Sequence, residues 1–427
     1  MALRLAFTMM RRVGGRRRRW GALTVGTMVG LGCASGGGDE GEGGNRGTEG
    51  AGAGDPASGT TTGGGDASTG GGGAAPDVLV ASSCPPGEVG LALDGDGRLV
   101  CDRPRGQIQT LLRERASLLF GYRDICGENC SSPPAKWGTV TSTACTDGAG
   151  ADNNCTTQSV GGNMVEWFGL NVDGDVDNND RFYLGLHIEA SVDDAAPEPG
   201  PCAPGAWMVG VETDGRITCS ALAPPALERA RAQCHVYFGW NDGCSSCTSP
   251  PGKWGRTASV GCEHGVGTNG LCLPEETYDG TSYRVYGLNV DGDVDDNDKF
   301  YFGLQCDVTD DAPPTTTGIC PPGTFVTKVT ADGGMTCTPL DALVADAFAE
   351  SCTLHFGWAD VCNGCTSGPT RRGQVRAGQC INGVGVNNIC TTAMLGGNTV
   401  ELFGLTTDGD VDDNDTFFLG LECAVTP

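Results

Sequence analysis

The sequence predicts a mainly β protein in which three tandem, disulfide-rich modules, each with one short helix, follow a signal peptide and a disordered Gly-rich tether. Two observations predict this class: a threefold internal repeat, and 23 cysteines among 427 residues. So many cysteines are typical of small domains stapled by disulfides in an oxidising compartment. Hydrophobic residues make up only 38% and glycine is 71 of the residues, which argues against one large core.

The repeat has a period of 118 residues, seen in the motifs that begin at Cys84, Cys202 and Cys320. This period is longer than a solenoid rung, so we expect three beads that fold separately. Short Pro- and Asp-rich seams at 193–201 and 310–318 separate the copies. The expected modules are copy 1 (78–192), copy 2 (193–310) and copy 3 (311–427).

Each copy is predicted to contain three parts. A hairpin with strand-like alternation comes first, turning at Asp-Gly in copy 2. An amphipathic helix follows, expected at 107–120, 226–238 and 340–352 from apolar positions at helical spacing. A cysteine- and glycine-rich β segment completes the copy, with period-two runs such as 283–290 and 299–306 flanking an acidic loop.

Comparison of the copies predicts most of the disulfides. Copies 2 and 3 each carry eight cysteines and copy 1 carries six, and the two that copy 1 lacks correspond to Ala116 and Ile188. Residues lost together behave as partners in one bond, and the first two cysteines of each copy bracket a short hairpin. The predicted bonds are Cys234–Cys306, Cys352–Cys423, Cys84–Cys101, Cys202–Cys219 and Cys320–Cys337. The four middle cysteines of each copy leave three possible connectivities.

The N-terminus reads as an export signal followed by a lipid-anchored tether. A basic run, RRVGGRRRRW, precedes a short apolar stretch that ends at Cys33. The segment VGLGC resembles a bacterial lipoprotein signal, which implies removal of residues 1–32 and acylation of Cys33. Pairing every other cysteine leaves Cys33 alone, and acylation accounts for it. The alternative is an ordinary secretory signal. Residues 33–77 have almost nothing to bury and are expected to form a low-complexity tether.

The motif DGDVDxND recurs in all three copies and predicts a calcium loop between two strands. Four carboxylates within eight residues repel one another unless a cation lies among them, and alternating hard oxygens suit Ca²⁺. The loop resembles the calcium loops of dockerin and thrombospondin type 3 repeats, and it lacks the Gly and Glu of an EF-hand. We expect the calcium to be structural and to clamp the terminal hairpin. The expected ligands are Asp173, Asp175, Asp177, Asp180, Asp291, Asp293, Asp295, Asp298, Asp408, Asp410, Asp412 and Asp415.

Other chemistries are less well supported by the residues. CSSC (244–247) and CNGC (362–365) suggest zinc, but copy 1 has a different spacing there, which disulfides tolerate better than a tetrahedral metal site does. The four histidines do not fall at equivalent positions, so no His-based catalytic group recurs. We therefore expect no enzyme.

Aromatic residues are the remaining candidates for a binding face. Tyr122, Trp240 and Trp358 share one motif and are expected in the core. Trp137 and Trp254 lie in PPxKWG, where copy 3 has Arg372, so these two are the better ligand candidates.

Two functional hypotheses follow from the sequence. The first is a calcium-stabilised repeat lipoprotein with a structural or adhesive role, anchored in the outer membrane and exposed at the cell surface. The second is an array of carbohydrate-binding modules that uses the exposed tryptophans. The partners would be the membrane, through the lipid, and a glycan or surface protein. The formal charge of −26 argues against nucleic acid.

Overall fold

The structure is a computed structural model, in which the chain separates into residues 1–69 and one compact unit, residues 70–427. All described residues belong to the second unit and begin at residue 78, so Cys33, the signal and the whole tether (33–77) lie outside them. The described ranges are 78–125, 131–177, 179–191, 196–212, 214–243, 249–267, 270–290, 292–295, 298–308, 313–360, 368–407, 409–412 and 415–425. No helix among these residues is long and apolar enough to cross a membrane.

The described residues are mainly β, as predicted, and equivalent elements recur in each copy. The helices are α1 (Arg105–Arg115), α2 (Ala223–Gln233) and α3 (Asp341–Ser351). Copy 1 contains β1 (Ser82–Ser83), β2 (Val89–Leu93), β3 (Leu99–Asp102), β4 (Ala116–Arg123), β5 (Lys136–Thr141), β6 (Cys145–Ala149), β7 (Asn154–Val160), β8 (Asn163–Asn171) and β9 (Arg181–Ile188). Copy 2 contains β10 (Glu198–Pro199), β11 (Ala206–Val211), β12 (Ile217–Ala221), β13 (Cys234–Asn241), β14 (Lys253–Ala258), β15 (Gly261–Val266), β16 (Leu271–Cys272), β17 (Glu276–Tyr278), β18 (Thr281–Tyr283), β19 (Val285–Asn289) and β20 (Lys299–Cys306). Copy 3 contains β21 (Thr315–Ile319), β22 (Thr324–Val329), β23 (Gly334–Pro339), β24 (Cys352–Ala359), β25 (Arg371–Arg376), β26 (Gln379–Val384), β27 (Ile389–Leu395), β28 (Asn398–Thr406) and β29 (Thr416–Cys423).

The helices are shorter at their C-terminal ends than the periodicity predicts. Each ends where the chain turns directly into a strand, at Ala116, Cys234 or Cys352. The strand begins there because this position pairs across the sheet with the last strand of the same copy, as Cys234 does with Cys306. The apolar residues that follow therefore alternate between two faces of a sheet, and tertiary pairing overrides the helical pattern.

The copies do not fold as separate beads, and that expectation is wrong. Each six-stranded sheet takes four strands from one copy and two from another. Copy 1 contributes β6, β5, β4 and β9 and receives β19 and β16 from copy 2; copy 2 receives β28 and β27 from copy 3; and copy 3 receives β8 and β7 from copy 1. The exchange is cyclic, so the chain has a pseudo-threefold arrangement.

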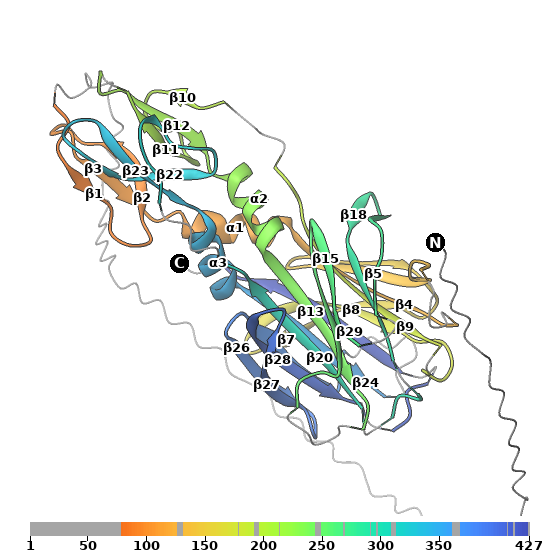
Figure 1. The fold of residues 1–427 in the computed structure, drawn as a ribbon. Coiled ribbons are helices and arrows are strands. Elements are labelled where there is room, and N and C mark those ends of the chain that lie inside the picture. The colour runs from red at the N-terminus through yellow and green to blue at the C-terminus, as the bar shows by residue number, and fades with distance from the viewer. Residues whose placement is uncertain are drawn as a thin grey trace, which may run out of the picture. The chain divides into compact units, whose positions relative to one another are not determined.

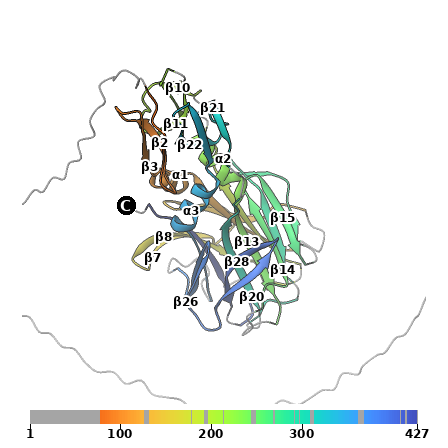
Figure 2. The same cartoon turned by 60° about the vertical axis from the view of Figure 1, so that its left-hand side comes forward.

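The elements form three layers around this pseudo-threefold axis. Figures 1 and 2 show the N-terminal hairpins of the copies gathered at one end, the three helices next to them, and the three large sheets beyond. At the core of the sheets Phe182, Phe300 and Phe417 contact one another, with ring centroids 5.2 to 5.3 Å apart. These rings are equivalent residues of the three copies, so the main core is shared among them.

The five predicted disulfides are all present. In copy 1 Ala116 and Ile188 oppose each other in the register that Cys234 and Cys306 occupy, which explains why both cysteines are missing together.

The structure also pairs two of the four middle cysteines in each copy. The bonds are Cys145–Cys155, Cys262–Cys272 and Cys380–Cys390. Each joins the edge strand of one sheet to the edge strand of the next, as Cys262 on β15 does to Cys272 on β16. The remaining middle cysteines, including those of CSSC and CNGC, lie outside the described residues.

Candidate metal site where three acidic loops meet

The acidic loops connect strands of different sheets. The loop of copy 1 runs from β8, which pairs with β29, to β9, which pairs with β4 and β19. The flanking segments are strands, as expected, but they do not pair with each other. A role in clamping a terminal hairpin is therefore wrong, because each loop is the crossover by which a copy passes from a neighbour's sheet to its own.

The three loops meet on the pseudo-threefold axis through a ring of backbone hydrogen bonds. Val176 N donates to Val411 O at 2.9 Å, Val294 N to Val176 O at 2.8 Å, and Val411 N to Val294 O at 2.9 Å. Each valine is 1% exposed and belongs to the main core. The valine between the acids of DGDVD is thus the residue that joins the copies, and each loop completes the hydrogen bonding of the others.

The fourth aspartate of each loop is buried and accepts backbone hydrogen bonds. Asp180 accepts from Ile125 N at 3.1 Å and from Asp177 N at 3.0 Å. Asp298 accepts in the same way from Gly243 and Asp295, and Asp415 accepts from Asp412. These three carboxyl groups, each 1 or 2% exposed, therefore hold the loop in shape from within.

Burial governs the proton affinity of these groups. Desolvation raises the pKa of Asp180 to about 6 and that of Asp298 to about 7, although the backbone hydrogen bonds oppose the shift. The neighbouring carboxylates Asp124 and Asp242 add to the rise at Asp180 and Asp298 respectively. Negative charge at this junction is therefore costly without a counter-charge.

The other aspartates of the loops lie nearer the surface. Asp175, Asp293 and Asp410, each next to an axial valine, are exposed, and Asp177, Asp295 and Asp412 are half-buried. Asp291 and Asp408 lie outside the described residues. These carboxylates are the donors that a hard cation prefers. Within the described part of the chain, however, no three His, Cys, Asp or Glu side chains are grouped so as to hold a metal ion.

A basic side chain lies beneath each loop, buried at Lys136 and Lys253 and half-buried at Arg371, and the sequence reasoning missed this role. Lys136 Nζ contacts Asn171 Oδ1 at 3.3 Å and Asp173 Oδ1 at 2.7 Å, with its side chain 6% exposed. Lys253 donates to Asn289 O, and Arg371 donates to the carbonyls of Thr406 and Thr407. All three reach the end of the strand that enters the loop. The signal was a basic residue at one fixed position of the PPxK motif in every copy.

The tryptophan candidates are not an exposed binding face. Trp254 is 6% exposed and lies over Gly265, where an added Cβ would come within 2.4 Å of the indole. Trp137 is half-buried and packs edge-on against Tyr278, at 5.0 Å between ring centroids. Trp254 therefore packs in the interior of the protein, and its prediction as a ligand-binding residue is wrong. Tyr122, Trp240 and Trp358 are core residues, as predicted.

Comparisons with family models, with curated proteins and with solved structures find no match for this chain.

Proposed function

We propose that the chain is a surface-displayed, calcium-stabilised protein with a structural or adhesive role, held on the membrane by a lipid at Cys33 and a Gly-rich tether. The observation that carries the proposal is the convergence of three acidic loops on one hydrogen-bonded valine ring. Calcium bound there would lower the repulsion among carboxylates that this convergence creates.

Calcium would act on the junction between copies. The loops are the crossovers of the strand exchange, so an ion that tightens one loop also tightens its contacts with the other two. The three copies would then work as one rigid body, and any adhesive surface would be presented by that body as a whole. The proposal therefore differs from the three separately folding modules that the repeat period predicted.

The calcium proposal is tested by thermal unfolding of the purified chain, first with EDTA and then with calcium added in the millimolar range. We expect the melting temperature to rise, because a ligand bound only by the folded state stabilises it by about 2.7 kcal/mol at one hundred times its Kd. The triple variant D175N/D293N/D410N removes one exposed carboxylate from each loop and is expected to lose the response.

The matched control is D96N/E114Q/E198Q, which removes three exposed acids that lie away from the loops. The control should keep the calcium response in full. An unchanged melting temperature for the parent chain would remove calcium from the proposal and leave the loops as a junction made by protein alone.

The lipid anchor is tested separately in a Gram-negative bacterium fed a clickable palmitate analogue. We expect label on the parent chain and recovery with the membranes, whereas C33S should carry no label and appear in the soluble fraction. A parent chain that never takes up label would favour the ordinary secretory signal.

A further inference from the structure

The face of each large sheet that points away from the main core carries a satellite cluster made by two copies. Face 1 contains Trp137 with Tyr278 and Tyr283; face 2 contains Tyr237 and Trp254 with Leu395; and face 3 contains Trp167 with Phe418. In every case two strands of another copy complete the sheet of the owner: β19 and β16, β28 and β27, and β8 and β7 respectively. The three faces are equivalent by position, but the hairpin of copy 2 is split, so that β17 and β18 pair separately from β16 and β19. Faces 2 and 3 are each completed by one continuous hairpin, so these two can be compared side chain by side chain.

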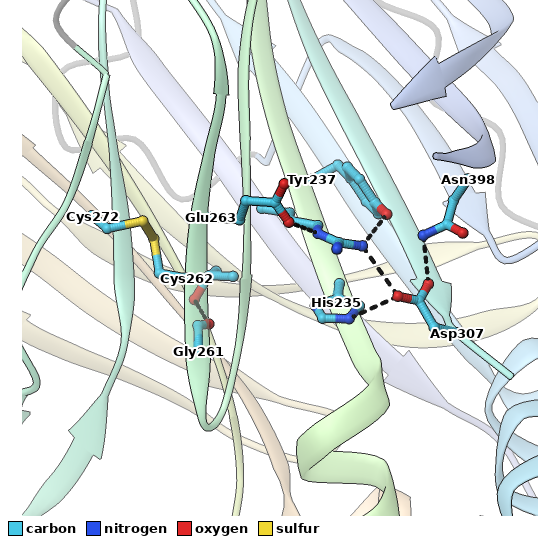
Figure 3. A network of polar contacts seen from close by, with 10 residues as sticks. His235, Tyr237, Gly261, Cys262, Glu263, Cys272, Asp307 and Asn398 are labelled. Atoms are coloured by element: carbon cyan, nitrogen blue, oxygen red, sulfur yellow. Dashed lines mark hydrogen bonds and ion pairs between the residues drawn. A yellow bond between two sulfur atoms is a disulfide. The ribbon is translucent and has the colours of Figure 1, made fainter. Parts of the chain in front are cut away.

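Face 2 is filled by charged groups that pair with one another (Figure 3). Arg256 contacts Glu263 at 2.8 Å, Asp307 at 3.2 Å and the hydroxyl of Tyr237 at 3.1 Å. Asp307 also accepts from Asn398 on the covering hairpin, at 2.8 Å. This network ties the hairpin of copy 3 to the sheet of copy 2.

Face 3 has smaller side chains at the positions that carry this network. Arg256 corresponds to Gln374, because each is cross-strand to an equivalent residue, Tyr237 or His355. Asp307 corresponds to Ala424, since each follows the last cysteine of its copy. A hollow of about 290 Å³ results, bordered by Gln374, Ala424 and the β7–β8 turn of copy 1.

The lining of this hollow is polar, and its charged groups already have partners. Glu422 pairs with the buried His355 at 3.2 Å, Glu350 pairs with Arg105, and Arg376 pairs with Gln379. What remains toward the hollow are amide and hydroxyl groups, including Asn163, Gln374 and Thr353, beside the apolar Ile381. Amide and hydroxyl groups, which can both donate and accept hydrogen bonds, next to a small apolar patch suit a neutral ligand rich in hydroxyl groups.

We propose that face 3 is a binding site for one ring of a neutral saccharide, formed where the β7–β8 hairpin of copy 1 meets the sheet of copy 3. This site is distinct from the carbohydrate site that the sequence predicted at Trp137 and Trp254. Sugar binding at face 3 would not depend on calcium. The volume is at the lower limit of small-molecule pockets, which fits a single ring better than an oligosaccharide. The hydroxyl groups of the ring would contact Gln374 and Asn163, and its apolar face would contact Ile381.

The site is tested by saturation-transfer NMR on the whole chain with glucose, galactose, mannose and N-acetylglucosamine, each at millimolar concentration, and with ethylamine as a cationic probe. We expect transfer to at least one sugar and none to ethylamine. The variant Q374R/A424D installs the face 2 residues in face 3 and should abolish the transfer. Q374L removes the amide at similar size and should reduce the signal at least fivefold.

The control is the reverse exchange, R256Q/D307A, which leaves face 3 untouched and must keep the parent's response. Melting temperatures of all variants establish that each is folded. No transfer to any of the four sugars, transfer to ethylamine alone, or an unchanged signal in both Q374R/A424D and Q374L would overturn the proposal. The outcome is separable from calcium binding, because the NMR measurement is repeated with EDTA.

Discussion

The loop junction and the three sheet faces respond differently to the same threefold arrangement. At the junction the three copies have the same structure: the equivalent valine of each makes the equivalent backbone hydrogen bond, and the equivalent aspartate of each is buried. The three faces differ: face 1 has aromatic packing, face 2 has ion pairs and face 3 has a hollow. A position on the axis touches all copies and tolerates little change, whereas a face involves only two copies. The axis therefore carries the fold, and the faces are where the copies are free to specialise.

The largest effect is expected on the axis, from F182A. Phe182 is 1% exposed and contacts both of its equivalents, so its removal leaves a cavity that costs about 3–5 kcal/mol. Denaturant unfolding measures the loss. F300A and F417A should lower the free energy of unfolding by the same amount within error. Three clearly different losses would show that the three copies do not contribute equally to stability at the axis.

Removing one inter-sheet disulfide is expected to cost about 2–3 kcal/mol. The double variant C262A/C272A opens a loop of 10 residues, and the loss arises chiefly because the unfolded chain is less constrained. Melting temperatures under non-reducing conditions provide the measurement. Equal losses for C145A/C155A and C380A/C390A are expected, and a loss confined to one copy would contradict the equivalence of the three sheet contacts.

Asp298 is expected to make stability depend on pH in the presence of EDTA. Its pKa is raised from an ordinary 3.8 to about 7, so the folded state binds the proton more tightly than the unfolded state does. Its contribution to stability is fully present below pH 3.8 and is lost as the pH rises through about 7. D298N should flatten the fall in unfolding free energy between pH 4 and pH 7, whereas D96N should leave the curve unchanged. The curve of the parent should also flatten if calcium supplies the missing counter-charge.

The smallest effect is expected on face 2, from R256Q/D307A. These side chains are partly exposed, at 14% and 30%, so the lost ion pairs should cost only about 1 kcal/mol. His235 and Arg256 outweigh the effect of burial and hold the pKa of Asp307 below its ordinary value. Its contribution is therefore present above the unfolded pKa and disappears as the pH falls through the folded value. A loss as large as that of F182A would contradict the distinction between axis and faces.

The sequence predicts the elements of each copy better than their assembly. Loss of two cysteines together from copy 1 predicts a bond that the register of Ala116 and Ile188 explains. Strand exchange leaves no such trace, because a strand has the same alternation whether its partner belongs to its own copy or to another. The axial valines are part of the motif DGDVD, but nothing in the motif shows that this valine hydrogen-bonds to its equivalents in the other copies. The hollow of face 3 arises because Gln374 and Ala424 are smaller than Arg256 and Asp307, their equivalents in face 2. The sequence alone does not show that these positions face the same space.

The pairing of β8 with β29 also sets an order of events during synthesis. β8 ends at residue 171, and its partner begins at residue 416. The sheet of copy 3 therefore cannot close until the chain has been made past residue 416, and β7 and β8 of copy 1 have no sheet to join while copies 2 and 3 emerge. A chain interrupted after the second copy would hold β7 and β8 without a sheet, with their edges open to pairing with other chains.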